Sequence, residues 1–242
     1  MDVVGQVAQW FGTPANWQGT NGIPTLLGEH VLMSLAASLI AMAIALPIGV
    51  VLGHLGKGGL LAINVTNVGR AIPSFALMVF FVLIFGLGTL PTLVALIVLA
   101  IPPVVTNAYQ GMRGVDRDLI DAARGIGMTE AQILWQVEVP VAIPVIMAGV
   151  RTAGVQVVAT ATLGAYVAWG GLGRFIENGL NTANGYPELI GGAILVALLA
   201  GATEGVLALL QWLLTPQGLR KAGASRAAGA AEPTASTVEA AA

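Results

Sequence analysis

Residues 71–112 contain no Asp, Glu, Lys or Arg, and this run of 42 uncharged residues limits the folds open to the chain. As one α-helix the run would be roughly 63 Å long, about twice the thickness of the hydrocarbon core of a bilayer. It therefore has to fold back on itself. The cluster of Gly and Pro at residues 86–91 is where we expect the break, with a spanning helix on either side.

Three other stretches carry almost no charge. Residues 31–53 have none, residues 139–173 have only Arg151, and residues 189–219 have only Glu204. Charged residues make up 9% of the chain, whereas a soluble domain has about a quarter. A spanning helix needs about 20 apolar residues. The sequence therefore predicts an all-α membrane protein with about five transmembrane helices, at residues 25–53, 59–86, 91–112, 138–168 and 189–215.

Several prolines and glycines fall inside these predicted spans. Neighbouring helices in a membrane bundle can satisfy the carbonyls that proline frees, so we expect kinks rather than helix ends. The prolines are Pro47, Pro73, Pro102, Pro103 and Pro144. Two pairs of glycines four residues apart, Gly49 with Gly53 and Gly201 with Gly205, favour close helix packing within the chain or between two copies.

The remaining composition excludes several kinds of chemistry. The chain has no cysteine, so disulfides and thiolate metal sites are excluded, and His30 and His54 are too isolated for a metal cluster. A net charge of −2 gives no reason to expect a nucleic-acid partner. The pair Gly56-Lys57 is followed by Gly58 and lacks the spacing of a phosphate-binding loop. We expect no catalytic site, metal or bound cofactor in this chain.

Lys and Arg are distributed unevenly between the predicted loops, which indicates the orientation of the chain. With the N-terminus outside, the cytoplasmic segments hold seven of these residues: Lys57, Arg113, Arg117, Arg124, Arg220, Lys221 and Arg226. The external segments then hold only Arg174. Because cytoplasmic loops carry the excess of positive charge, we expect the N-terminus outside and the C-terminus in the cytoplasm.

The two ends of the sequence differ from the spans. Residues 1–24 show no cleaved signal peptide, and we expect them to form an external or interfacial segment with Trp10, Phe11 and Trp17 as anchors. Residues 25–218 are the predicted transmembrane domain. Residues 219–242 are rich in Ala, Gly, Ser and Thr, and are predicted to be a disordered cytoplasmic tail.

The longest polar segment between the spans, at about 113–138, begins with the pattern of a short helix. Asp116 is a good N-cap, Asp118 lies in the first turn and Arg124 in the last, as the helix dipole favours. One apolar face is expected from residues at helical spacing, namely Val115, Leu119 and Ala122 or Ala123.

A second short helix is predicted in the same segment. Gly125 and Gly127 end the first helix, and Thr129 with Gln132 forms a capping box for the next one, before Pro140 starts the fourth span. The apolar side of this second helix is Ile133, Leu134 and Val137. The spacing leaves two interpretations open, a hairpin that packs on the bundle or an element that contacts a partner.

This segment resembles the "EAA…G…I-x-L-P" signature of the permease subunits of bacterial ABC importers. The matching residues are Asp121, Ala122, Ala123, Gly127 and Pro140. The departures are conservative: Asp121 for Glu, Val137 for Ile and Val139 for Leu. Motifs elsewhere resemble the permeases for glycine betaine, choline and carnitine, at residues 70–74, 86–89, 101–103, 107–111 and 170–173.

The resemblance implies a type I ABC importer-like core of five helices whose short cytoplasmic helices couple to an ABC ATPase that binds Mg-ATP. In such proteins Ala122 and Ala123 would allow close approach to the ATPase, Gly127 the turn, and Asp121 a carboxylate for donors on the ATPase. It also implies an extracytoplasmic substrate-binding protein, a second permease, identical or related, and uptake of a quaternary-amine osmoprotectant across a bacterial plasma membrane. The alternatives are a permease for another small zwitterion such as an amino acid, an ATP-independent carrier or channel, and a membrane scaffold.

Three ionisable residues inside the predicted spans, Arg70, Arg151 and Glu204, lie roughly 15 to 18 Å from the cytoplasmic ends. An unpaired charge at this depth is costly, so Glu204 is expected to neutralise Arg151 or Arg70, either beside the translocation path or, as we favour, as a structural pair.

Aromatic side chains could also hold a quaternary ammonium group. The candidates are Tyr109, Tyr166 and Trp169. An aromatic belt at the membrane interfaces is the favoured explanation for them.

Overall fold

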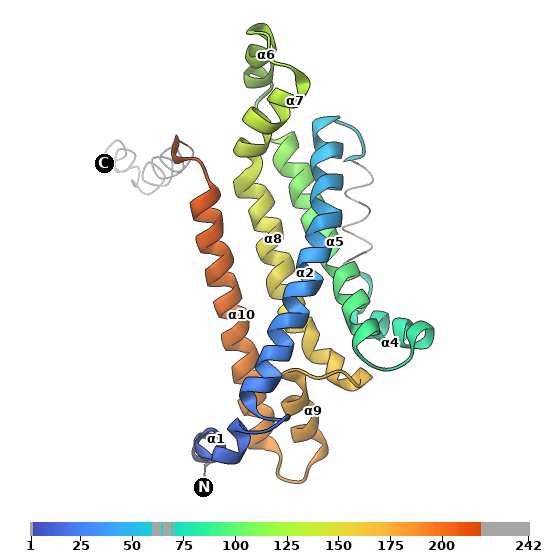
Figure 1. Cartoon of the computed structure of the whole chain (residues 1–242), viewed down its shortest axis with the longest axis vertical. Helices are drawn as coiled ribbons and strands as arrows, with labels where there is room; N and C mark the ends of the chain where they lie inside the picture. The colour runs from blue at the N-terminus through green and yellow to red at the C-terminus, as the bar shows by residue number, and fades with distance from the viewer. Residues whose placement is uncertain (1, 60–63, 65–68, 70, 219–242) are drawn as a thin grey trace, which may run out of the picture.

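The computed structural model describes residues 2–59, 64, 69 and 71–218, and every regular element within these residues is helical. The long helices run side by side along the long axis of the molecule (Figure 1). They are α2 (Ile23–His54), α5 (Thr89–Arg113), α8 (Val139–Ala161) and α10 (Tyr186–Leu214). In the described part, four helical stretches are long and apolar enough to cross a membrane, which agrees with four of the five predicted spans.

The predicted second span, at 59–86, lies partly outside the described residues. Its described part contains α4 (Ser74–Phe85), whose 12 residues would be about 18 Å long and too short to cross the hydrocarbon core alone. Pro73 is the N-cap of α4, so the prediction that it kinks the middle of a helix was wrong. The predicted break after this helix is confirmed, because Gly86 and Gly88 adopt φ of +80° and +128°, which only glycine tolerates well.

The other prolines lie inside helices as predicted: Pro47 in α2, Pro102 and Pro103 in α5, and Pro144 in α8. Pro140 does not begin a separate span. The short helix α7 (Glu130–Ile133), the π-helix η2 (Leu134–Glu138) and α8 run on without interruption, so residues Glu130–Val167 form one helical stretch. Pro140 follows the π-helix η2 directly, and it lacks the amide hydrogen that would otherwise bond to the carbonyl of Gln136.

Small residues let α2 and α5 approach closely along their length. Ala37, Ala41 and Ala45 of α2 are fully buried. A Cβ atom added to Gly49 would come within 2.6 Å of the Cβ of Ala108 in α5. The Gly49 and Gly53 pair therefore packs within the chain, whereas Gly201 and Gly205 have no atom near their missing Cβ positions and face open space.

At the end of the bundle that carries the N-terminus, His30 joins three segments. Its Nε2 lies 2.9 Å from the carbonyl oxygen of Val158 in α8, and the amide of Leu172 donates to its Nδ1 over 3.2 Å. This arrangement requires the hydrogen on Nε2 and a neutral ring. In the sequence, His30 is only an isolated histidine. The fold buries it and supplies both partners, because α2, α8 and the loop after η3 (Thr162–Val167) pack together at this point.

The N-terminal segment packs against the same end of the bundle. It comprises α1 (Val3–Gly12) and the 3-10 turn η1 (Pro14–Trp17). Trp10 makes an edge-to-face contact with Phe175 of α9 (Gly173–Asn181), with ring centroids 5.2 Å apart, and lies over Gly191 of α10. Trp10 is thus a packing residue of the helical bundle in this structure.

Candidate coupling site

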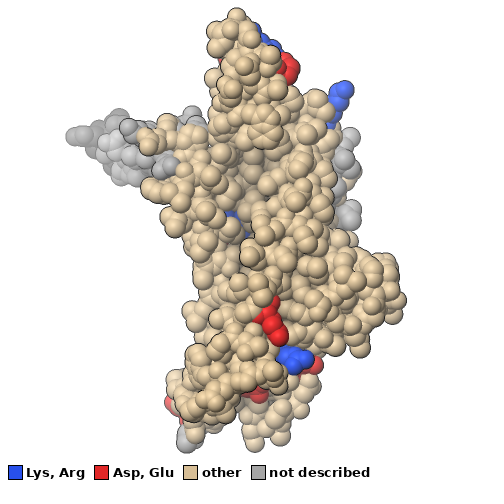
Figure 2. Space-filling view, viewed as in Figure 1, with Lys and Arg blue, Asp and Glu red and all other residues tan. Residues whose placement is uncertain are grey.

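The helix α6 (Arg117–Gly125) stands beyond the long helices at the opposite end of the molecule from α1 (Figure 1). Its N-cap is Asp116, whose carboxylate accepts from the amide of Asp118 at 3.0 Å. Acidic Asp118 in the first turn and basic Arg124 in the last turn complement the helix dipole, as predicted. In the space-filling view, charged side chains gather toward the two ends of the molecule, and the middle is almost free of them (Figure 2).

The turn after α6 depends on Gly127, whose φ of +86° lies in the left-handed region. The amide of Gly127 donates to the carbonyl of Arg124 at 2.9 Å, and that of Met128 donates to Ala123 at 3.2 Å. The next helix begins at Thr129, and the predicted capping box with Gln132 is present in both directions. The N-cap, the turn at Gly127 and the capping box predicted for this segment are thus confirmed, whereas α7 continues into α8.

The residues of α6 that are buried against the bundle differ from those predicted. Ile120 and Ala123 are buried, whereas Leu119 and Ala122 are exposed. Residues 120 and 123 share one side of the helix because they are three apart, and their side packs against the cluster around Ile133. The prediction that placed Leu119 on the buried face was therefore wrong.

A second face of α6 is open. Leu119, Ala122 and Ile126 follow one another at spacings of three and four residues, and 81% of Ile126 is exposed. Asp121 is exposed as well, on the neighbouring side of the helix that carries Arg124. We call these four residues the tip surface. It combines apolar side chains, a small residue and one carboxylate on a helix that stands beyond the bundle.

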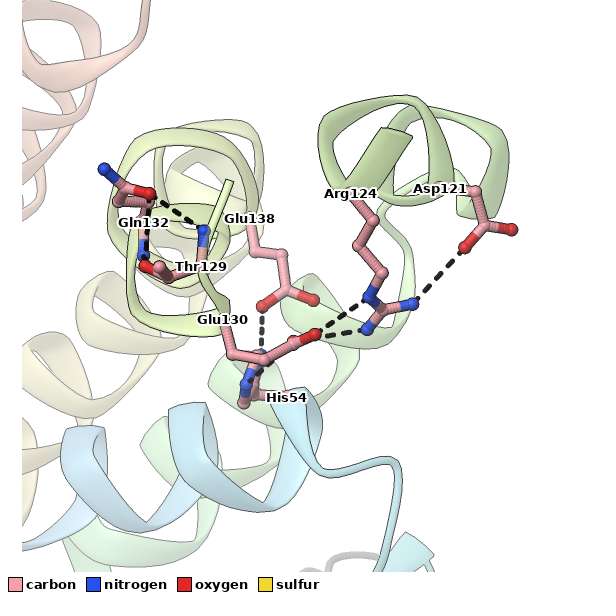
Figure 3. A network of polar contacts seen from close by, with 7 residues as sticks. All are labelled: His54, Asp121, Arg124, Thr129, Glu130, Gln132 and Glu138. Carbon is pink, nitrogen blue, oxygen red and sulfur yellow. Dashed lines mark hydrogen bonds and ion pairs between the residues drawn. The ribbon is translucent and has the colours of Figure 1, made fainter. Parts of the chain in front are cut away.

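A polar network holds α6 in place from behind (Figure 3). Arg124 donates from Nε and from an NH2 group to the two carboxylate oxygens of Glu130, at 2.9 and 3.2 Å, and from its other NH2 group to Asp121 at 3.3 Å. The hydrogen bond to Glu130, followed by the charge of that carboxylate, raises the pKa of Arg124 above its usual value. Arg124 therefore clamps the end of α6 to the start of α7.

The same network reaches α2. His54, the last residue of α2, has its Nε2 3.9 Å from a carboxylate oxygen of Glu130, and its Nδ1 contacts the carboxylate of Glu138 in η2. Glu138 is buried and His54 is half-buried. The network thus connects α6, the α7–η2 stretch and the end of α2. The sequence does not predict this network, since His54 and Glu138 are 84 positions apart and no local pattern links them.

The predicted path residues Arg151 and Glu204 form an ion pair between α8 and α10. The Nε of Arg151 donates to Glu204 at 3.0 Å, and one of its NH2 groups donates to Gln211 at 2.6 Å. Gln211 in turn donates to the carbonyl of Pro144 at 3.0 Å. The pairing is as hypothesised with Arg151 as the partner, while Arg70 lies outside the described residues. In the single chain the two side chains are 32% and 41% exposed, and they line a groove of about 680 Å³ between the helices.

The structure does not gather the three aromatic candidates into a cage. The ring of Trp169 is buried beside His30, with centroids 5.9 Å apart. Tyr166 is partly exposed and makes an edge-to-face contact with Phe75, whereas Tyr109 lies in the last turns of α5 beside Gly59. Each ring thus has its own surroundings, and that of Trp169 is the core rather than a membrane interface.

Comparison with known proteins identifies the family. The family model described as the binding-protein-dependent transport system inner membrane component matches residues 45–216. The chain belongs to this family. The matched region includes α6 and its turn, so the segment that resembles the ABC permease signature lies within the family's domain in this permease.

Individual relatives agree with this assignment. A carnitine transport permease of Listeria monocytogenes is 44% identical over 80% of this chain and 88% of its own length. A choline transport system permease of Bacillus subtilis is 41% identical over 80% and 88%, and a glycine betaine/carnitine/choline permease of the same species is 40% identical over 83% and 93%.

Solved structures establish the fold. The structure of the MetNI methionine ABC transporter in an inward-facing conformation matches with a TM-score of 0.69 at 23% identity, over 80% of this chain and 96% of that one. An amino acid ABC transporter matches with a TM-score of 0.65 at 19% identity, over 87% and 98%. This permease therefore has the all-helical fold of an ABC importer permease, as the sequence predicted.

Proposed function

We propose that this permease is the translocation subunit of an ATP-driven importer for a small quaternary amine such as glycine betaine, choline or carnitine. Three relatives at 40–44% identity are named for these substrates. The matching solved structures are named for methionine and for an amino acid, but at 19–23% identity they carry the fold alone. Uptake of an amino acid is the second candidate for the substrate.

The observation that carries the coupling role is the tip surface. A capped helix beyond the bundle exposes Leu119, Ala122 and Ile126 with the carboxylate of Asp121 beside them. An apolar patch with a polar edge is typical of a protein docking site. In the proposed function it docks on an ABC ATPase, which binds Mg-ATP and performs the hydrolysis, so this chain acts without catalysis or a cofactor of its own.

The polar network would transmit a displacement of the docked helix to the bundle. The ATPase pulls on α6, Arg124 and Glu130 pass the displacement to α7, and His54 passes it to α2. Because α7, η2 and α8 are one continuous helical stretch, α8 tilts with the same movement. Such rigid-body tilting switches a transporter between two access states.

The orientation proposed for this permease places α6 in the cytoplasm and α1 outside, in the plasma membrane of a bacterium. At the α6 end of the described chain lie Lys57, Arg113, Arg117 and Arg124, whereas Arg174 lies at the α1 end. This distribution follows the excess of positive charge on the cytoplasmic side. An extracytoplasmic binding protein would deliver substrate at the α1 end, and a second permease would complete the path.

Cross-linking tests the coupling role directly. The chain contains no cysteine, so Ala122→Cys provides a single exposed thiol on the tip surface. In membranes that contain the assembled transporter, this variant is expected to cross-link to the ATPase. The matched control is Ala123→Cys, whose side chain is buried against the bundle and is expected to react far more slowly. An Ala122→Cys variant that never cross-links to the ATPase, or reacts only with reagents added outside the cell, would refute the coupling role and orientation.

Transport assays test the substrate. The assembled transporter in proteoliposomes is expected to accumulate glycine betaine, choline or carnitine when ATP and the binding protein are present. Methionine and histidine serve as comparison substrates in the same vesicles. Accumulation of an amino acid with no uptake of the three quaternary amines would replace the proposed substrate with the second candidate.

A further inference from the structure

A strip of polar side chains runs along the apolar helix α8. Thr152, Gln156 and Thr160 follow one another at intervals of four residues and therefore lie on one face. Thr152 is exposed and the other two are half-buried, whereas the neighbouring Val157 and Val158 are buried on the other side. Roughly 20 Å along the helix axis separates Val139 from Thr152, so the strip lies well inside the predicted span.

A groove lies on each side of the strip. Toward α5 and residues 72–74 lies a groove of about 280 Å³ that all three strip residues line, and toward α10 lies the larger groove that contains the Arg151–Glu204 pair. The two grooves share Thr152 and Gln156. The smaller groove is close to the lower limit of volumes for small-molecule sites, roughly 300 Å³.

Backbone oxygen adds polarity to the smaller groove. Pro102 and Pro103 line it, and neither has an amide hydrogen, so the carbonyls of Val98 and Leu99 lack their usual helical donors. Leu99 lines the same groove. None of the described residues that line it is charged. The described lining therefore offers hydroxyls, an amide and, at Leu99, a backbone carbonyl that lacks its helical donor.

The strip has unused hydrogen-bonding capacity. The hydroxyl of Thr152 donates to the carbonyl of Ala148 at 2.9 Å, but the side chains of Gln156 and Thr160 have no hydrogen-bond partner among the described residues. A side-chain amide in contact with lipid tails is unfavourable, because lipid offers it no partner. Beyond the described residues, the partners open to it include water, a transported molecule and another polypeptide.

We propose that Thr152, Gln156 and Thr160 line the route of the substrate through this permease, and that these neutral polar side chains form a weak binding site for a small quaternary-amine zwitterion or cation. This inference rests on the proposed function. A quaternary ammonium has no hydrogen to donate, so carbonyl and hydroxyl oxygens attract it through their partial charges, while the Gln156 amide can donate to a carboxylate. Contacts to neutral side chains are weak, so the cargo is released easily, as a path requires.

The competing occupant of the strip is a second permease packed directly against it. The hollow on both sides of Gln156 favours a path, since packed helix interfaces are filled by side chains. Gly205 of α10 lines neither groove and has no atom of the described chain at its missing Cβ position, so it offers another face for close helix packing.

Cysteine labelling distinguishes the two occupants. The probe is 2-(trimethylammonium)ethyl methanethiosulfonate, which carries the proposed headgroup and does not enter lipid. In the assembled transporter, Gln156→Cys and Thr160→Cys are expected to react at least tenfold faster than Leu198→Cys, an exposed apolar position on α10, and reaction should stop uptake. Equal rates at all three positions, or a disulfide between two Gln156→Cys permeases that excludes the probe, would overturn the proposal.

A change of substrate preference provides a second, independent test. Gln156→Glu places a negative charge in the strip, so the ratio of choline to glycine betaine uptake should rise about fivefold, the effect of one charge contact in water. Gln136→Glu is the matched control, since it makes the same change at an exposed position near α6. An unchanged ratio for Gln156→Glu would overturn the proposal. If Ala122→Cys still cross-links to the ATPase in these backgrounds, the failure concerns the strip and not the proposed function.

Discussion

Replacing Gly127 by alanine is expected to weaken binding of the ATPase about 5- to 30-fold. The φ of +86° at Gly127 lies in the region that an L-residue with a Cβ atom occupies at a cost of about 1–2 kcal/mol. No other atom lies within 4 Å of the position that the new Cβ would take. The cost is therefore backbone strain alone, and it opposes the turn that sets the angle between α6 and α7.

Gly125 supplies a matched control two residues away. It is the last residue of α6, also has open space at its missing Cβ, and is not among the glycines with positive φ. Alanine there is compatible with the helix and is expected to leave the affinity unchanged. Asparagine at position 127 should fall between glycine and alanine, because it tolerates left-handed backbone better than other residues with a side chain.

The assay is a titration of the purified permease variants with the ATPase in detergent, followed by ATP-driven uptake in proteoliposomes. Binding isolates the turn from later steps of transport. If Gly127→Ala binds the ATPase as tightly as Gly125→Ala, the left-handed turn does not position the docking helix and the reasoning is wrong.

Three other predictions concern the bundle, and thermal unfolding in detergent measures each of them. Gly49→Val should lower stability by about 1–3 kcal/mol because α5 occupies the space, whereas Gly201→Val, in open space, should change little in the isolated permease. Glu204→Gln should lower the melting temperature by leaving Arg151 without a charged partner, and replacing both by apolar residues should restore most of the loss. Glu138→Leu should cost about 1–3 kcal/mol because it removes the carboxylate that contacts the end of α2, while Glu138→Gln, which can still form a hydrogen bond, should cost less.

Features of this permease that depend on neighbouring residues could be predicted from the sequence. The N-cap at Asp116, the capping box from Thr129 to Gln132 and the turn at Gly127 were all predicted correctly. Each is decided within one or two helical turns by hydrogen bonds to nearby backbone or by an allowed φ. Four spans were also predictable, since a lack of charge over about 20 residues is itself the requirement for crossing a membrane.

Which side of a helix faces the protein could be predicted only in part. On α6, Leu119 and Ile120 are both apolar, and the sequence favoured the wrong one as the buried residue. The choice depends on how α6 leans against α7, which the turn and the Arg124–Glu130 contact set together. The continuity of α7 with α8 through a π-helix was likewise hidden by Pro140, a residue that usually marks a helix start.

Partners distant in the sequence were decided by the tertiary structure alone. By depth alone, Glu204 could have paired with Arg151 or with Arg70, and the packing of α8 beside α10 brought it to Arg151. His54 and Glu138 meet only because α2 ends beside η2, and the grooves beside Gln156 are formed by residues of α5, α8 and α10 together. Local sequence determines where helices begin, end and tolerate lipid, because those energies arise within a few residues. The side chains that share a groove or an ion pair are determined by packing between helices, which no single stretch of the chain contains.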